Sequence, residues 1–211
     1  MSRTLLIFVL LAASAGRGEI IDRVVAVAGR RVITASDVDR EARLEAYFNR
    51  LPPPLGALGP GPQYQATRER LIRQRLVLQE REQIELQSAG EAEVKKQAAD
   101  LGSNSASPGD YGLQEQDLLE YVRRLANVTS FVELRFKTGI EIAPDQVASY
   151  YEKNLLPELA RRGIAVPPPL DQVRSQIEEA LVEERTNELL DRWLAEQRAR
   201  VGVRVLEADQ P

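Results

Sequence analysis

The sequence predicts a mainly α-helical fold with a small β element. We expect a multi-helix module with an N-terminal β-hairpin, a C-terminal strand, and a long C-terminal helix packed back on the module. Apolar residues recur at helical spacing over most of the chain, with charged residues between them. Valine-rich runs on either side of a glycine open the pattern after residue 19, and an alternating apolar run closes it at residues 201–206.

The first residues have the pattern of a secretion signal. Arg3 supplies a positive start, residues 5–13 are apolar, and residues 13–15 (ASA) fit a cleavage site made of small residues. We expect residues 1–15 to be a signal peptide that is cleaved after Ala15, so that the protein is exported without stable membrane insertion. The alternative is a retained anchor, although the apolar run is well short of the ~20 residues that span a bilayer.

The composition excludes several classes of function. The chain has no Cys and no His, which removes disulfides, the usual zinc, copper and haem ligands, and Ser-His or Cys-His nucleophile pairs. The net charge of −4 is mild and both signs are interspersed. Neither a nucleic acid nor a membrane surface is therefore an expected partner, and we expect no metal and no cofactor.

The first predicted elements are a hairpin and a helix. Residues 20–28 and 32–34 are rich in valine and isoleucine, which favour extended structure. Gly29 between them permits the positive φ of a tight turn. A helix should begin at Ser36, with the acidic Asp39 suited to its first turn.

The middle of the chain is predicted to contain helices separated by two loops. Proline and glycine dominate residues 51–62, and small polar residues dominate residues 102–112, so neither segment can be regular. Between the loops we expect one helix over about residues 65–86. A shorter helix should follow, with Ser88 and Glu91 as its capping box.

Two further helices and a connector are expected next. One helix should run, continuously or with a restart, from residue 114 to residue 136. Another should open at Pro144, because a proline in the first turn loses no helical hydrogen bond. Pro157 and the prolines at 167–169 indicate an irregular connector over residues 155–170.

The last predicted elements are a long helix and a strand. A helix from about residue 171 to residue 200 would be roughly 45 Å long. Such a helix must reach back across the chain or leave an apolar stripe free for a partner. Because a lone strand is not stable, residues 201–206 should pair with the N-terminal hairpin and join the two ends of the chain.

Three segments carry a resemblance to a known family. Residues 22–39 (DRVVAVAGRRVITASDVD) form a valine-rich hairpin followed by a helix start. Residues 134–154 (LRFKTGIEIAPDQVASYYEKN) combine a helix end, an extended linker and a proline-capped helix with a Tyr-Tyr pair. Together with residues 189–207 (LLDRWLAEQRARVGVRVLE), they resemble the N-terminal chaperone module of the SurA family of periplasmic foldases.

The chain departs from this family at one place. Full-length relatives carry one or two parvulin-type prolyl isomerase domains between the Tyr-Tyr helix and the closing helix, whereas residues 155–170 alone fill that space here. Parvulin active sites also use His. The resemblance therefore implies a chaperone module over residues 19–154, a proline-rich connector in place of the isomerase, and a closing helix and strand over residues 171–207. It implies a periplasmic protein of a Gram-negative-type envelope that is not an enzyme.

Aromatic and large apolar side chains are the candidates for client contact, because they give a large contact area that tolerates different sequences. The residues that we predict to bind client peptides are Tyr121, Leu125, Phe136, Tyr150, Val173, Ile177, Leu181 and Trp193. The alternative is that they fill the core. An acidic group also stands out, comprising Glu178, Glu179, Glu183 and Glu184. It suits a solvated helix face better than a cation site.

Three functions follow from these observations. The first is an ATP-independent chaperone (a holdase) that binds unfolded or nascent envelope proteins, including outer-membrane proteins, in an apolar groove. The second is an adaptor or assembly protein with one fixed partner, and the third is a prolyl isomerase with an unrecognised site. Because the connector is short, the long helix could also exchange between two copies and give a domain-swapped homodimer.

Overall fold

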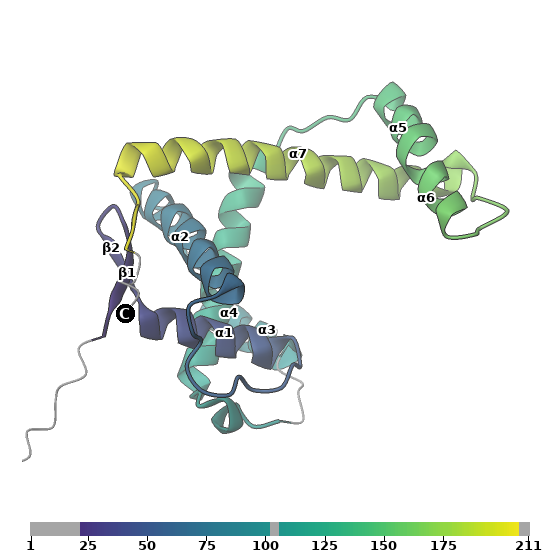
Figure 1. Ribbon diagram of the computed structural model, residues 1–211. Coiled ribbons are helices and arrows are strands. Elements are labelled where there is room, and N and C mark those ends of the chain that lie inside the picture. Colours follow the sequence, from purple (N-terminus) through teal and green to yellow (C-terminus); the bar gives the residue numbers. More distant parts are fainter. Residues whose placement is uncertain (1–21, 102–105, 207–211) are drawn as a thin grey trace, which may run out of the picture.

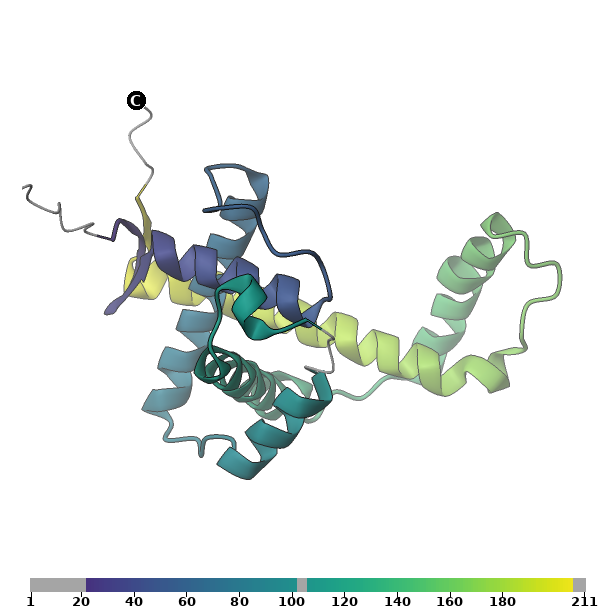
Figure 2. The ribbon, with the colours of Figure 1, turned by 90° about the horizontal axis from the view of Figure 1, so that it is seen from below.

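The computed structural model describes residues 22–101 and 106–206; the predicted signal peptide and its cleavage site at Ala15 lie outside them. Helices dominate, with a small antiparallel sheet and a long C-terminal helix, which confirms the predicted fold class. The long helix α7 (Leu170–Val201) lies across the molecule (Figure 1). One end of α7 rests on the sheet and the neighbouring helices, and the other end carries two short helices away from them (Figures 1 and 2).

The sheet joins the two ends of the described chain. Strand β1 (Val24–Ala28) lies between β2 (Arg31–Thr34) and β3 (Arg204–Val205), and both pairings are antiparallel. The pairing is extended by the Leu206 amide, which donates to the Val25 carbonyl at 3.0 Å. The predicted return of the C-terminal strand to the hairpin is confirmed.

The hairpin turn requires a glycine for two reasons. Gly29 has a φ of +59°, a conformation that L side chains rarely adopt. A Cβ at this position would also lie 3.0 Å from the side-chain oxygen of Gln79. Gln79 belongs to α2 (Pro62–Gln83), so the turn packs directly against this helix.

Helix α1 (Ala35–Phe48) is capped by Thr34 and not by Ser36, which corrects the predicted start. Thr34 is the last residue of β2 and has extended dihedrals, so its hydroxyl can accept from the Asp37 amide at 3.3 Å. The Asp37 carboxylate accepts from the Thr34 amide at 3.0 Å in return. The strand therefore passes into the helix without an intervening loop.

The predicted capping box of α3 (Glu91–Leu101) is also wrong. The first amide bond in this helix runs from Val94 to the carbonyl of Gly90, two residues beyond Ser88. The Ser88 hydroxyl accepts from the Arg81 guanidinium instead, at 3.3 Å. Arg81 at the end of α2 therefore binds the hydroxyl that the local pattern assigned to the cap.

Two helices of the second half continue through π-helical turns. The segments are, in chain order, α4 (Glu115–Val132) with its turn η2 (Glu133–Lys137), then α5 (Pro144–Tyr150) with its turn η3 (Tyr151–Leu155), and α6 (Leu156–Arg161). Pro157 follows the π-helical turn η3 inside a continuous helical segment, because Leu155 and Leu156 before it both have helical dihedrals. The predicted connector over residues 155–170 is therefore helical in its first part and irregular only over residues 162–169.

Two hydrophobic cores hold the module together. The main core lies between the sheet, α2, α4 with η2, and α7, and its largest members include Ile33, Ile72, Phe131 and Trp193. The second core lies between α1, α3, α4 and the 3₁₀ turn η1 (Pro108–Tyr111), and includes Leu44, Tyr47, Val94, Tyr111 and Val122. The N-terminal half of α7 belongs to neither.

That half of α7 has its own small packing unit, which we call the arm: residues 144–169 together with residues 170–185 of α7. Helix α5 packs against α7, and the most deeply buried side chains are Val147 and Ile177. The Tyr151 hydroxyl donates to the Pro168 carbonyl at 2.7 Å, which ties the end of the connector to the helices. The arm is therefore a folded extension and not a free helix end.

Replacing Trp193 with alanine should destabilise the whole protein, because the indole is only 6% exposed and packs in the main core. We expect the free energy of unfolding to fall by about 3–5 kcal/mol. Chemical denaturation followed by circular dichroism measures this loss. Trp193→Phe, which retains a ring, is the matched control and should lose clearly less. A loss below about 1 kcal/mol for the alanine variant would show that α7 is not seated through this residue.

Candidate functional site

The aromatic residues predicted to bind clients lie mostly inside the cores. Phe136 and Trp193 are buried with Phe131, and the three ring centroids are 5.5 to 6.1 Å apart. The guanidinium of Arg135 covers the cluster at 5.8 to 5.9 Å from each ring. Neither Phe136 nor Trp193 is accessible to a client, so the alternative interpretation, that they fill the core, describes them.

Tyr121 and Leu125 lie in and against the second core, on α4. The Tyr121 ring stacks on Phe48 at 5.0 Å and is 8% exposed. Burial raises the pKa of the Tyr121 phenol to about 12, and the nearby carboxylates of Glu41 and Glu45 contribute to the rise. The phenol is therefore not positioned to meet a client.

The remaining predicted residues are in the arm. Ile177 is 3% exposed and holds α7 against α5. Tyr150, Val173 and Leu181 are half-buried, so each leaves part of its side chain at the surface. The structure thus distributes the predicted binding residues over three places, and only those of the arm offer accessible apolar area.

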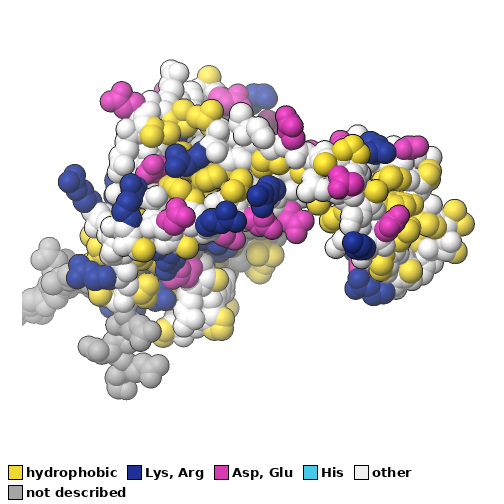
Figure 3. Space-filling view, turned by 90° about the horizontal axis from the view of Figure 1, so that it is seen from above, with side chains coloured by type: hydrophobic (Ala, Val, Ile, Leu, Met, Phe, Trp, Pro, Cys, Tyr) yellow, Lys and Arg dark blue, Asp and Glu magenta, His cyan; other side chains and the backbone are white. Residues whose placement is uncertain are grey.

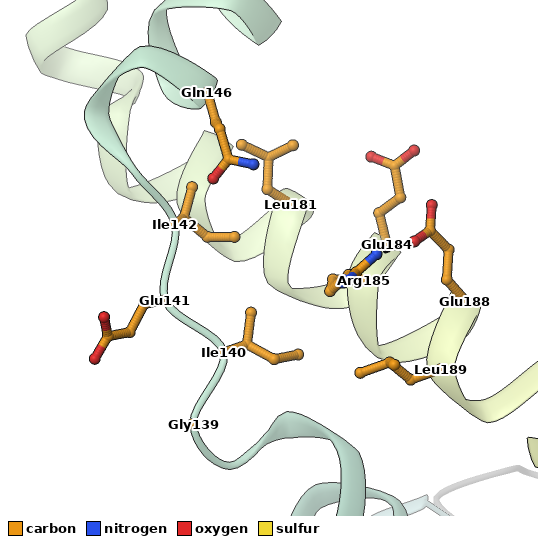
Figure 4. Close-up of a pocket in the computed structure, with 10 residues that line it drawn as sticks. All are labelled: Gly139, Ile140, Glu141, Ile142, Gln146, Leu181, Glu184, Arg185, Glu188 and Leu189. Atoms are coloured by element: carbon orange, nitrogen blue, oxygen red, sulfur yellow. Dashed lines mark hydrogen bonds and ion pairs between the residues drawn. The ribbon is translucent and has the colours of Figure 1, made fainter.

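An open groove lies where the arm joins the module. It runs between α7 and the extended linker of residues 138–143, and encloses about 680 Å³. We call it the neck groove. The linker side chains Ile140 and Ile142 point toward Leu181 and Leu189 of α7, whereas Glu141 points away (Figure 4). These four half-buried residues form an apolar floor.

Of these residues, the sequence interpretation had named only Leu181. Ile140 and Ile142 were missed because a short linker with one charged residue between two isoleucines is usually taken as solvent-exposed coil. Their period-two alternation is nevertheless the pattern of an extended segment with one apolar face. Leu189 was missed because its exposure depends on where the arm diverges from the module.

The linker is held extended by the residues at its ends. Gly139 has a φ of +86°, which ends the preceding helical turn. Pro144 disfavours helical dihedrals at the residue before it, and Ala143 has φ −73° and ψ 147°. In the part of the chain that the structure describes, the amides of Glu141 and Ile142 make no hydrogen bond within the protein. The linker therefore presents unpaired backbone donors beside an apolar floor.

The rim of the neck groove is mainly acidic. Glu141, Glu184 and Glu188 line it together with one cation, Arg185, whose guanidinium bonds Glu188 at 2.9 Å. Along this face of α7 the acidic group identified in the sequence is largely exposed, as expected for a solvated helix surface. Within residues 22–101 and 106–206, no group of three or more carboxylates could hold a metal ion.

Hydrophobic side chains also gather over the arm on the face seen in Figure 3. The largest exposures are at its tip, where Val166 is 85% exposed and Ile164 is also exposed. For the described residues, no helix has both the length and the apolar character needed to cross a membrane.

Comparisons with known proteins leave the class to be argued from the structure. No model of a known protein family matches the chain, and a search of curated proteins finds no match. The fold and the groove define a helical module with a small closing sheet and a protruding arm, which meet at an apolar groove with an acidic rim.

An alkaline titration should show whether the Tyr121 phenol is buried. Its folded pKa of about 12 lies above the ordinary value of about 10, so this group stabilises the folded state below pH 10 and the stabilisation is lost as the pH rises through 12. Phenolate absorbance after a rapid pH jump, compared between the wild type and Tyr121→Phe, isolates the group. The difference should have its midpoint near 12. A midpoint near 10 would mean that the phenol is open to solvent and available to clients.

Proposed function

We propose that the protein is an ATP-independent chaperone that holds non-native polypeptide segments in the neck groove. The observation that carries this proposal is the apolar floor of Ile140, Ile142, Leu181 and Leu189 beside unpaired backbone amides. Such a site suits an extended segment with alternating apolar side chains. It does not depend on one client sequence.

The binding mode is strand addition. Successive amides of an extended segment point to opposite edges, so a client segment lying along one edge of the linker would pair through its own carbonyl with the free amide of that edge. Every second client side chain would pack between the linker and α7. Main-chain pairing contributes affinity with any sequence, and the floor adds a preference for large apolar residues. An adaptor with one fixed partner would instead need sequence-specific contacts, so these donors favour the chaperone over the adaptor.

The acidic rim refines the client class. Glu141, Glu184 and Glu188 exceed Arg185 in charge, so segments with apolar residues flanked by Lys or Arg should bind better than acidic ones. Because the pairs on the rim are exposed, this preference should weaken at high salt.

The resemblance to the SurA family supports the same proposal. The segments that carry it are the hairpin, the linker with α5, and the end of α7 with β3, and relatives with this module bind unfolded envelope proteins. We propose the periplasm as the place of action, since the expected signal peptide leads there. In this structure α7 and β3 close on their own chain. Exchange of both elements between two copies would preserve the same contacts, and light scattering separates the two states.

Aggregation of a model client tests the proposed function. The wild-type protein should suppress thermal aggregation at a several-fold molar excess, and Ile140→Ser with Ile142→Ser should lose most of that effect. Both side chains are half-buried and outside the two cores, so the melting temperature should change by only a few degrees.

The control for this experiment is Leu134→Ser, which removes an exposed apolar side chain from the neighbouring turn η2 but not from the groove. It should suppress aggregation as well as the wild type does. Absence of suppression by the wild type itself would refute the chaperone proposal, and equal losses in both variants would refute the groove.

The main-chain part of the mechanism has a separate test. Glu141→Pro removes one free amide, whereas Glu141→Ala keeps it. The Glu141 side chain, which both variants lose, points away from α7 (Figure 4). We expect the proline variant to bind a labelled extended apolar peptide several-fold more weakly, on the order of 1 kcal/mol. Fluorescence anisotropy measures this, and equal affinities of the two variants would exclude strand addition along the edge that carries the Glu141 amide.

A further inference from the structure

A second cleft, built from other elements than the neck groove, lies between α2 and α4 and encloses about 290 Å³. Four arginines line it: Arg75 and Arg81 from α2, and Arg123 and Arg124 from α4. The chain as a whole carries a net charge of −4. A concentration of guanidinium groups in a cleft of an acidic protein therefore calls for a specific explanation.

The carboxylates of the cleft do not neutralise these arginines. Glu82 pairs with Arg31 outside the cleft at 2.6 Å, and Glu120 accepts from the Gln116 amide. Arg124 is the one arginine of the cleft with an ion pair, to the buried Glu41. Arg75 and Arg123 make no ion pair or hydrogen bond among the described residues.

The arginines also carry buried donors without partners. The Nε–H groups of Arg75, Arg81 and Arg124 are buried and make no hydrogen bond within the described chain. Arg81 is only 5% exposed, and its terminal nitrogens are held by the Gln87 carbonyl and the Ser88 hydroxyl. Buried unsatisfied donors are costly and therefore uncommon. Arg81 and Arg124 are therefore held by their other bonds, and all three arginines have hydrogen-bonding capacity that is unused.

The local electrostatics favour an anion at this place. Burial lowers the pKa of Arg75, and the neighbouring charges of Arg124 and Arg31 lower it further, while Asp37 and Glu41 oppose the shift. An anion in the cleft would relieve this repulsion. It would also accept from donors that no other group reaches.

We infer that the cleft between α2 and α4 binds a phosphate-type oxyanion. Guanidinium groups match the oxygens of phosphate with two parallel hydrogen bonds each, and phosphate offers oxygens in several directions. Donors converging from two helices need such an acceptor. A monocarboxylate has two coplanar oxygens and one negative charge, which would leave most of the donors unpaired.

Isothermal titration of the full chain with inorganic phosphate at pH 8 tests the inference. Acetate at equal ionic strength serves as the comparison. We expect saturable binding of phosphate that acetate does not reproduce, and a rise in melting temperature with phosphate concentration. Arg123→Gln and Arg75→Gln should each weaken binding by at least tenfold.

The matched control is Arg192→Gln, which removes the same charge from an exposed position on α7 outside the cleft. It should bind phosphate as the wild type does. Absence of saturable binding, or equal weakening in all three variants, would overturn the inference, because the attraction would then be nonspecific.

A second arm uses phenyl phosphate to identify the source of the oxyanion. Tighter binding than that of inorganic phosphate would assign the cleft to a phosphomonoester carried on a larger molecule, and weaker binding would assign it to free phosphate. The inference does not rest on the proposed function. The Ile140→Ser, Ile142→Ser variant should bind phosphate normally, so failure of one proposal leaves the other standing.

Discussion

The rest of the structure depends on one constraint: the C-terminal strand returns to the N-terminal hairpin, and Trp193 of α7 packs in the main core. The β1–β3 pairing is short, so it fixes the direction of the chain end but contributes little to the stability of α7 on the module. Three ion pairs join α7 and α2, namely Arg198 with Glu69, Arg200 with Glu80, and Arg73 with Asp191. They involve partly exposed groups and contribute at most about 1 kcal/mol each. The buried ring cluster around Trp193 contributes more than these pairs, so packing decides where α7 lies.

Once one end of α7 is fixed, its length determines where the arm stands. The helix has 32 residues and is therefore about 48 Å long, which is far more than the main core covers. The arm is connected to the module by α7 and by the linker of residues 138–143 alone. Because Gly139 and Pro144 hold the linker extended, both walls of the neck groove are positioned by backbone geometry. The groove is open without any local unfolding.

The sequence predicted the fold well because its elements have strong local signals. Valine-rich runs on either side of a glycine favour a hairpin, and apolar residues at helical spacing favour a long helix. The alternating residues 201–206 favour a strand, for which the hairpin is the available partner. The wrong predictions concerned helix caps, where a residue of the preceding element acts as the cap or binds the predicted capping side chain. Thr34 replaced Ser36 as a cap because β2 runs directly into α1, and Ser88 was taken by Arg81.

The binding residues were harder to predict, since exposure is a property of the tertiary arrangement. Trp193 and Ile177 lie on the same helix and have the same apolar character, yet one belongs to the main core and the other to the arm. Nothing in the local pattern shows where α7 leaves the module. The neck groove lies at that point, so its floor could be recognised only after Leu189 and Ile140 were found to face each other (Figure 4).

The partial burial of the groove floor sets the strength of binding that it can support. A fully buried isoleucine or leucine contributes about 1.5–3 kcal/mol, and these half-buried side chains have at most about a third of that area left to bury. Several such contacts with a few main-chain bonds must also offset the ordering of the client segment. The surplus corresponds to micromolar or weaker binding, which allows release without ATP. A more exposed floor would bind more tightly, but it would also expose a larger apolar patch to self-association when no client is present.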